Sequence, residues 1–293
     1  MIFKFDRSDG ILTTVDQSAF KGDQGFSNPE RHVYLSPGGQ HAYYSGYQLD
    51  AGSLKLVSGR TFEKIYAEDR HGTFAIGAGH VFDAKLVQPV VALPHGAMTA
   101  LLTPDDQELW YYSPETARLY YVNPYDLIAG RALGVREIDP APLASHTFTK
   151  LIHDPVRPRL YGLDTAHAVV VVIDTATLQP IREIRVGNTP TDLDIDPAGV
   201  TLFVGHLDVL GFARIDLTTL TFERFVFTPS NSYRVVALGA DRVVTNDDGQ
   251  WTGAMLTDAA TGAVLSSAGS HEGALSATGD RTTLFLGDSG LSG

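Results

Sequence analysis

The chain of 293 residues contains no cysteine. Disulfide bonds, thiol catalysis and cysteine-ligated metal sites are therefore excluded. The absence alone does not fix a compartment, but it suits a bacterial periplasm or cell surface, where an unpaired thiol is a liability. We expect such a location outside the cytoplasm, either periplasmic or at the cell surface as a secreted protein.

Cationic side chains are also scarce, with 22 Lys and Arg against 34 Asp and Glu and a formal net charge of -12. Nucleic acid is not an expected partner, because phosphate binding needs clustered Lys and Arg. No run of eighteen apolar residues occurs, so no membrane insertion is expected. The opening residues, Met1–Asp6, lack the apolar core of a signal peptide and have the pattern of a β-strand.

Glycine and proline are plentiful, at 29 and 15 residues, which is typical of many short strands and turns. An apolar strand, a turn rich in Pro, Gly or Asp, and a second strand recur along the chain. The turns at Pro155, Pro197, Gly239 and Gly279 are 42, 42 and 40 residues apart. A fixed period of this length predicts a repeat architecture, such as a β-propeller.

The clearest repeat covers Val170–Thr177 (VVVIDTAT), Val186–Pro190 (VGNTP), Asp196–Gly199 (DPAG) and Leu202–His206 (LFVGH). These segments resemble the V-x-V-I-D-T-x-T, V-G-x-x-P, S-P-D-G and V-Y-V-T-N parts of the YVTN-type repeat found in surface-layer and related seven-bladed β-propellers. Weaker copies cover most of the chain. The resemblance implies a fold rather than a function, because the family includes surface-layer proteins, periplasmic proteins and propeller enzymes.

We therefore predict an all-β, single-domain protein, a seven-bladed β-propeller of four-stranded antiparallel blades. The expected blades span residues 31–69, 70–96, 97–145, 146–188, 189–230, 231–270, and 271–293 together with 1–20. In the last blade, the C-terminal segment supplies two strands, and Ile2–Phe5 and Ile11–Val15 supply the other two. Sharing one blade between the two ends closes the ring and removes an open sheet edge.

The second blade is the ambiguous part of this prediction. Its strands are expected at Thr73–Gly77, His80–Leu86 and Pro89–Leu93, with an inner strand at Lys64–Glu68. A six-bladed ring with one long insertion is the alternative. No helix is predicted, because glycines in the one segment with helical character, Pro124–Arg136, favour a loop.

In a propeller, the loops that lead into the inner strands surround one mouth of the central channel. Several histidines recur at or near this position, and we predict a ligand-binding site where they converge. The candidate residues are Glu30, Arg31, His32, His71, His95, His146, Tyr233, Arg234, His271 and Glu272.

Two interpretations of these histidines stay open. Imidazole and carboxylate groups suit a divalent metal such as Zn²⁺ or Mn²⁺, and histidine is also an acid or base near neutral pH. Alternatively, the histidines cap loops and face solvent. No cofactor and no catalytic residue are assigned, and a divalent metal at the channel mouth is the open option.

Three carboxylates alternate along one strand, at Asp192, Asp194 and Asp196, and so share one face. The segment lacks the glycine spacing of a calcium-binding EF-hand loop, which favours a solvated or turn-facing role.

The predicted function is a non-enzymatic scaffold that binds a protein, peptide or glycan through its loops, as a monomer or as one domain of a larger protein. One alternative is an enzyme of the propeller lactonase or lyase type, which the fold resembles and which places His and Glu at the channel. The other is a subunit of a larger redox or surface assembly.

Overall fold

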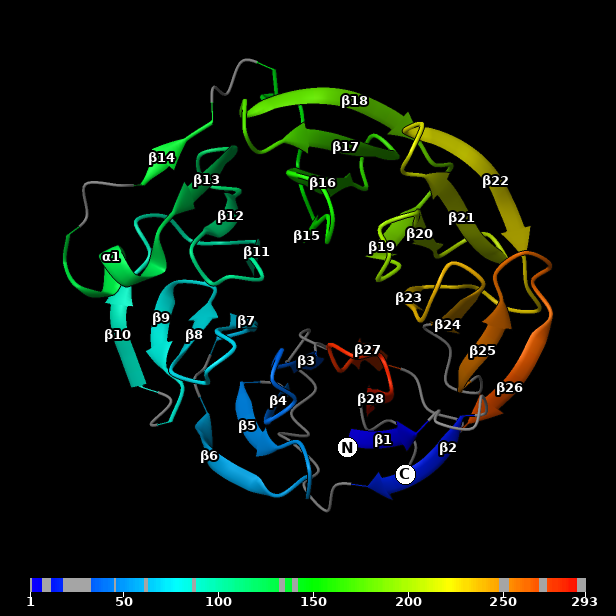
Figure 1. Cartoon of the computed structure of the whole chain (residues 1–293), viewed down its shortest axis with the longest axis horizontal. Coiled ribbons are helices and arrows are strands. Elements are labelled where there is room, and N and C mark those ends of the chain that lie inside the picture. Colours follow the sequence, from blue (N-terminus) through cyan, green and yellow to red (C-terminus); the bar gives the residue numbers. More distant parts are fainter. Residues whose placement is uncertain are drawn as a thin grey trace.

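The protein is a seven-bladed β-propeller (Figure 1). The computed structural model describes residues 2–6, 12–17, 33–44, 46–60, 63–85, 88–131, 135–138, 142–247, 253–268 and 273–288. Within these residues the strands form seven four-stranded antiparallel sheets that stand as blades around a central axis. This arrangement confirms the predicted fold class and rules out the six-bladed alternative.

From its inner to its outer edge, the first blade contains β3 (Val33–Leu35), β4 (His41–Tyr44), β5 (Tyr47–Asp50) and β6 (Leu56–Arg60). The second blade contains β7 (Ile65–Glu68), β8 (Phe74–Gly77), β9 (His80–Asp83) and β10 (Gln88–Ala92). The third blade contains β11 (Thr99–Leu102), β12 (Leu109–Ser113), β13 (Arg118–Val122) and β14 (Arg136–Glu137).

The fourth blade contains β15 (Lys150–His153), β16 (Arg159–Asp164), β17 (Val169–Asp174) and β18 (Gln179–Arg185). The fifth blade contains β19 (Pro190–Ile195), β20 (Thr201–His206), β21 (Gly211–Asp216) and β22 (Thr221–Phe227). The sixth blade contains β23 (Arg234–Ala237), β24 (Arg242–Asn246), β25 (Ala254–Asp258) and β26 (Val264–Ala268). The seventh blade is β27 (Gly273–Ala277), β28 (Thr283–Asp288), β1 (Ile2–Asp6) and β2 (Thr13–Gln17).

The seventh blade joins the two ends of the sequence, as predicted. Strand β1 pairs with β28 on one side, where Phe5 lies opposite Leu284, and with β2 on the other. All four strands lie side by side at the bottom of Figure 1, in blue and red. The ring is therefore closed by hydrogen bonds between residues almost a full chain length apart.

The second blade contains all four of its expected strands, but it begins earlier than residue 70. Strand β7 pairs with β8, so Ile65–Glu68 is the inner strand of this blade and does not belong to the first. The expected division between residues 69 and 70 is corrected accordingly. The same shift reassigns Arg70 and His71 to the turn that follows β7, because they come after the inner strand.

Each pair of neighbouring blades encloses a cluster of buried apolar side chains. Side chains alternate between the two faces of a strand, so Val170 and Val172 pack toward the fifth blade while Val169, Val171 and Ile173 pack toward the third. Both faces of β17 are buried, which is why its sequence is a continuous apolar run rather than an alternating one.

Aromatic side chains fill these contacts between blades. Between the third and fourth blades, Trp110, Tyr112 and Phe148 are at most 1% exposed. Each such ring removes a large apolar area from water. The packing of one blade on the next therefore stabilises the ring as a whole.

One short helix was not predicted. Helix α1 (Pro124–Ile128) lies at the outer edge of the ring next to β10 (Figure 1). The Asn123 side chain accepts hydrogen bonds from the amides of Tyr125 and Asp126, and Pro124 occupies the first turn, where its missing N–H costs nothing. The helix-favouring effect of Asn123 and Pro124 outweighs the helix-breaking effect of the glycines that follow in the sequence. None of the described helices is long and apolar enough to span a membrane.

Candidate binding site on the channel axis

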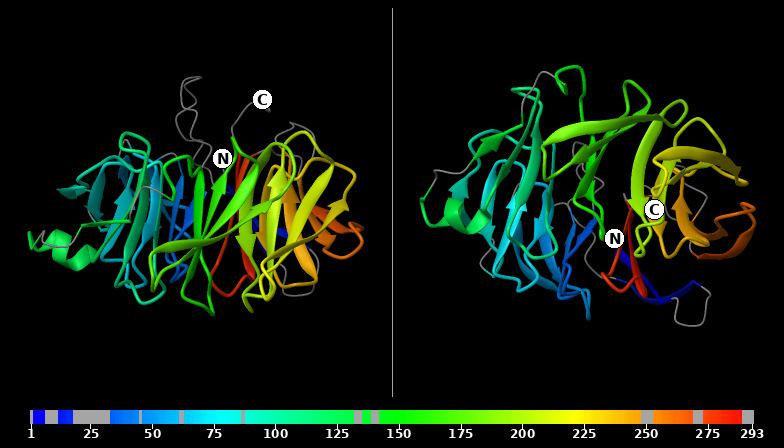
Figure 2. Two further views of the ribbon diagram at one scale, coloured as in Figure 1. Left: turned by 90° about the horizontal axis from the view of Figure 1, so that it is seen from above. Right: turned by 45° about the horizontal axis from the view of Figure 1, so that its top comes forward.

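The ring has two faces, which differ in the connections they carry. We call the face formed by the loops leading into the inner strands the loop face, and the face formed by the turns leaving the inner strands the turn face. Seen edge-on, the strands run between these two faces (Figure 2). The central channel opens on both, and the sequence analysis placed the ligand site on the loop face.

Half of the predicted site lies outside the described residues, and nothing tests it: Glu30, Arg31, His32, His271 and Glu272. Of the other five, His71 lies on the turn face, for the reason given above. His95, His146, Tyr233 and Arg234 lie on the loop face, in or next to the loops that lead into β11, β15 and β23.

The four loop-face residues interact mainly within their own blades rather than with one another across the channel. His95 stacks on Tyr120, with ring centroids 4.9 Å apart. The Nδ1 atom of His146 lies 2.9 Å from an Asp164 carboxylate oxygen. The Arg234 guanidinium lies 4.7 Å from the centre of the Tyr233 ring, and Arg234 also lines the channel. Among the described residues these contacts stay mainly within single blades, and the convergence of the histidines at the channel mouth stays a prediction.

The turn face is held together by one repeated device. The residue that follows an inner strand folds its side chain over the turn and accepts hydrogen bonds from the backbone amides there. Asp69 accepts from Thr73 and Phe74, Asp154 accepts from Val156 at 2.9 Å, and Asp196 accepts from Ala198 at 2.9 Å. These aspartate oxygens satisfy the turn amides in place of water. Each turn therefore holds a fixed position around the axis.

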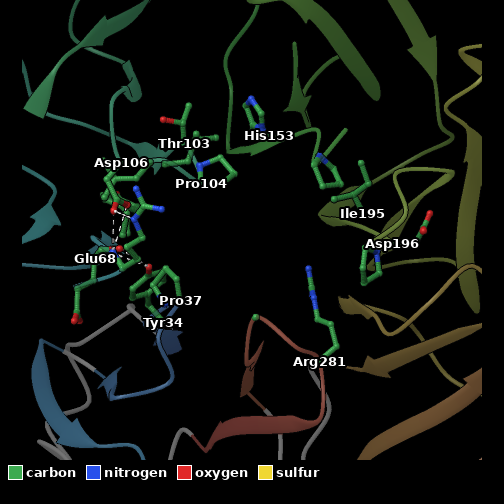
Figure 3. Close-up of a pocket in the computed structure, with 18 residues that line it drawn as sticks. Tyr34, Pro37, Glu68, Thr103, Pro104, Asp106, His153, Ile195, Asp196 and Arg281 are labelled. Atoms are coloured by element: carbon green, nitrogen blue, oxygen red, sulfur yellow. Dashed lines mark hydrogen bonds and ion pairs between the residues drawn. The ribbon is translucent and has the colours of Figure 1, made fainter. Parts of the chain in front are cut away.

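A cavity with a volume of about 460 Å³ lies on the axis and opens on the turn face. We call it the axial funnel. Figure 3 shows Glu68 and Asp106 on one side of it, with Arg281 and Asp196 across the open space. Its lining residues are Tyr34, Pro37, Tyr66, Ala67, Glu68, Arg70, Leu101, Leu102, Thr103, Pro104, Asp106, His153, Pro155, Ile195, Asp196, Pro197, Gly279 and Arg281.

Four prolines contribute to the rim of the axial funnel. Pro37, Pro104, Pro155 and Pro197 come from the turns of four different blades. Val156, which follows one of these prolines, is 63% exposed. The rim is therefore apolar and, because proline has a fixed φ, stiff.

The alternating carboxylates of β19 face the channel and are not solvated, contrary to the expectation from sequence. Asp192 pairs with the Lys150 ammonium, and Asp194 binds the Arg281 guanidinium through two contacts of 2.6 and 3.2 Å. Asp192 and Asp194 also accept hydrogen bonds from the amides of Val235 and Ala237, on the neighbouring inner strand. They satisfy donors that the open edge of β23 would otherwise leave unpaired. The turn-facing role expected of this segment holds for Asp196.

The opposite wall of the axial funnel is acidic and buried. Glu68 is 1% exposed, and one of its oxygens lies 2.8 Å from Nδ1 of His41. The Tyr34 hydroxyl accepts a hydrogen bond of 2.9 Å from the Glu68 amide. Asp106 lies 3.1 Å from the Arg70 guanidinium. Each of these side chains therefore has at least one structural partner, while Oε2 of Glu68 is buried without a hydrogen-bond partner among the described residues.

Burial changes the protonation of two groups in the axial funnel. It raises the pKa of Asp106, against the opposing effect of the Arg70 amide and charge. It lowers the pKa of His153, so the neutral imidazole is favoured there. The axial funnel thus offers an uncharged imidazole and paired charges inside an apolar rim.

Comparison with known proteins supports the fold. No protein-family model matches the sequence, and no curated protein matches it. Among solved structures, the β-propeller domain of Cps50 (Swd1) from Myceliophteria thermophila is similar, with a TM-score of 0.63 and 13% sequence identity over 87% of this chain and 95% of that chain. At this identity the likeness shows a shared β-propeller architecture.

Proposed function

We propose that the protein is a binding scaffold that holds a peptide segment or loop of a partner protein in the axial funnel on its turn face. The observation that carries this proposal is a cavity of about 460 Å³ inside a stiff apolar rim. Exposed apolar groups around a concave site are typical of surfaces that bind other molecules. A rigid ring also presents its turns in fixed positions, which limits the entropy lost on binding.

The polar groups of the axial funnel favour binding over acid–base chemistry. His41 engages Glu68, Arg70 engages Asp106, and backbone amides engage Asp196. A catalytic carboxylate is expected to reach a substrate proton directly, whereas these carboxylates already hold turns and strands in place. In a binding scaffold, these residues keep the structural roles that their contacts show.

The test compares two valines of similar exposure. Val156→Glu places a charge next to Pro155, a residue of the rim of the axial funnel, and Val57→Glu places one on the outer strand β6, where the valine is 50% exposed. Peptides selected from a random displayed library against the wild-type protein serve as the probe, with affinity measured by fluorescence anisotropy. We expect Val156→Glu to weaken binding at least about tenfold and Val57→Glu to leave it unchanged, because a rim charge must be desolvated in the complex.

Two results would contradict the proposal. One is a library that yields no peptide specific for the folded protein. The other is a selected peptide that binds Val156→Glu as tightly as wild type, which would place the binding surface elsewhere.

We infer a kinship with the YVTN-type propellers from the motif of the fourth and fifth blades. Its parts occupy β17, the loop before β19, the turn after β19, and β20, which are the positions that such a repeat requires. An alignment of related sequences in which the loops before other inner strands lack V-G-x-x-P would contradict it.

A further inference from the structure

A cluster of metal-ligating side chains lies in the fourth blade on the loop face, apart from the axial funnel. His146 precedes β15, Asp164 ends β16, and His167 lies in the turn between β16 and β17. The Nδ1 atoms of His146 and His167 lie 2.9 and 2.7 Å from the same oxygen, Oδ2 of Asp164. All three potential ligand atoms lie within 4.8 Å of one another.

The fold holds this cluster in place from two sides. Asp164 is fully buried, and it accepts hydrogen bonds from the amides of His167 at 3.1 Å and Thr147 at 3.3 Å. His146 is 6% exposed and stacks on Phe148, with ring planes 12° apart. The His167 side chain is 56% exposed. Two ligands are thus fixed by burial, and the third leaves a route from solvent.

A carboxylate stands behind one of the imidazoles, as is common around metal ligands. Oε1 of Glu183 lies 3.4 Å from Nε2 of His146, on the side of the ring away from Asp164. Oδ2 of Asp164 lies closer, 2.9 Å from Nδ1, so each ring nitrogen of His146 faces a carboxylate oxygen. A metal ion bound at Nδ1 would take the place of the proton shared with Asp164, while Glu183 would orient the ring from Nε2.

We propose that His146, Asp164 and His167 bind one divalent transition-metal ion, with water completing the coordination. Two imidazoles and one carboxylate form the ligand set of many three-ligand sites, and imidazole selects Zn²⁺ and its neighbours over Mg²⁺ or Ca²⁺. The ion would join the loop before β15 to the turn after β16, so its binding would stabilise this edge of the fourth blade. The site lies within one blade and does not draw ligands from several blades across the channel.

The chain provides a matched control for this site. His80 also directs Nδ1 at a carboxylate, 2.5 Å from Oε1 of Glu63, and its side chain is 42% exposed. That pair contributes one imidazole and one carboxylate, whereas the proposed site contributes two imidazoles and one carboxylate. His167→Ala and His80→Ala therefore both remove a partly exposed histidine that faces a carboxylate.

The test titrates Zn²⁺ into chelator-treated, dialysed full-length protein by calorimetry, and Co²⁺ by its visible absorption. We expect one equivalent to bind to wild type and His80→Ala, and saturating Zn²⁺ to raise the thermal midpoint of both. We expect His167→Ala to bind at least about tenfold more weakly with no rise in midpoint, and Glu183→Gln to lose about tenfold in affinity through the orientation of His146.

Both variants of the site change side chains that are more than half exposed, so their folding can be verified by urea denaturation without metal. A wild-type protein with no saturable Zn²⁺ binding would overturn the proposal. Binding of equal strength to wild type and His167→Ala would do the same, because it would place the ion at other residues.

Discussion

His206 is fully buried at the end of β20, and its two ring nitrogens have different surroundings. Nδ1 donates a hydrogen bond of 2.7 Å to the Asn188 carbonyl, whereas Nε2 is buried without a partner among the described residues. Burial lowers the pKa of His206, against the opposing effect of the Asn188 carbonyl. The neutral imidazole is therefore part of the folded state.

We predict that neutral His206 contributes to the free energy of unfolding and that this contribution is lost at acidic pH. Because its pKa is lower in the folded protein than its ordinary value of 6.5, the unfolded chain binds more protons below that pH. Its contribution is complete above pH 6.5 and is lost as the pH falls toward the folded pKa. Each unit by which the pKa is lowered corresponds to about 1.4 kcal/mol.

We expect His206→Asn to reduce the loss in free energy of unfolding between pH 7 and pH 5, measured by urea denaturation at both values. Asparagine keeps a donor for the Asn188 carbonyl and does not titrate in this range. His71→Asn, which changes an exposed histidine, should leave the difference as in wild type. An unchanged difference in His206→Asn would contradict the assignment. His41 acts in the opposite sense, because its hydrogen bond to Glu68 raises its pKa and its contribution is lost as the pH rises.

At the residue scale, the sequence predicts which carboxylates share one face of a strand, but not which cations they bind. The alternation of Asp192, Asp194 and Asp196 correctly placed three carboxylates on one face of a strand. Their cations come from Lys150, 42 residues before Asp192, and Arg281, 87 residues after Asp194. Spacing within one strand carries no information about such distant groups, so of the expected solvated or turn-facing role only the turn-facing part held, for Asp196.

At the scale of single elements, β20 shows how closely neighbouring blades approach. A Cβ atom on Gly205 would lie 2.3 Å from the Ser232 carbonyl oxygen, which belongs to the segment leading into the sixth blade. The same oxygen accepts a hydrogen bond of 2.9 Å from the His206 amide. The missing side chain is therefore what allows backbone to meet backbone between two blades.

We expect Gly205→Ala to lower the free energy of unfolding by about 1–3 kcal/mol, because the clash is with backbone and forces the two blades apart. Gly52→Ala is the control, since a Cβ there meets one side-chain oxygen, at 3.3 Å, in an exposed turn. Its effect should stay within about 0.5 kcal/mol. Urea denaturation followed by tryptophan fluorescence measures both, and equal effects would contradict the role assigned to Gly205.

Elements were predicted well where the local pattern was strong. The strands at Phe74–Gly77 and His80–Asp83 lie where the apolar runs indicated. All four strands of the second blade were expected, but its boundary was placed after its inner strand, because its repeat lacks the proline turn of its neighbours, and this error put His71 on the wrong face. The axial funnel was missed, although prolines at four equivalent turns were visible in the sequence as a signal for its rim.

At the scale of the whole molecule, stability depends on ring closure. Phe5 of β1 is fully buried in the cluster between the sixth and seventh blades, together with Leu284 and Leu286. Loss of this side chain removes apolar packing and leaves a cavity at the point where the two ends of the chain meet.

We expect Phe5→Ala to lower the free energy of unfolding by about 3–5 kcal/mol. Phe222→Ala on the outer strand β22, where the side chain is 43% exposed, should cost less than about 1 kcal/mol. Thermal and urea denaturation of both variants measure the difference. Similar losses would mean that the seventh blade contributes no more than a surface strand.

Closure was predictable from sequence because two unpaired strands at each end sum to one blade. The site was less predictable, because its surface is built from turns of six blades, which only the ring geometry brings together. The repeat fixes the number of blades, whereas the chemistry of the channel depends on residues that differ from one copy to the next.

Sharing a blade between the two termini also has a consequence for biosynthesis. Strands β1 and β2 are synthesised before β28, the partner of β1, and more than 260 residues separate β2 from β28. Until then the earliest strands carry an unsatisfied edge, and the contact that finishes the circle spans nearly the entire polypeptide. Closure of the ring must therefore wait until β28 has been synthesised, and a ribosome stalled before β28 would hold an incomplete seventh blade and an open ring.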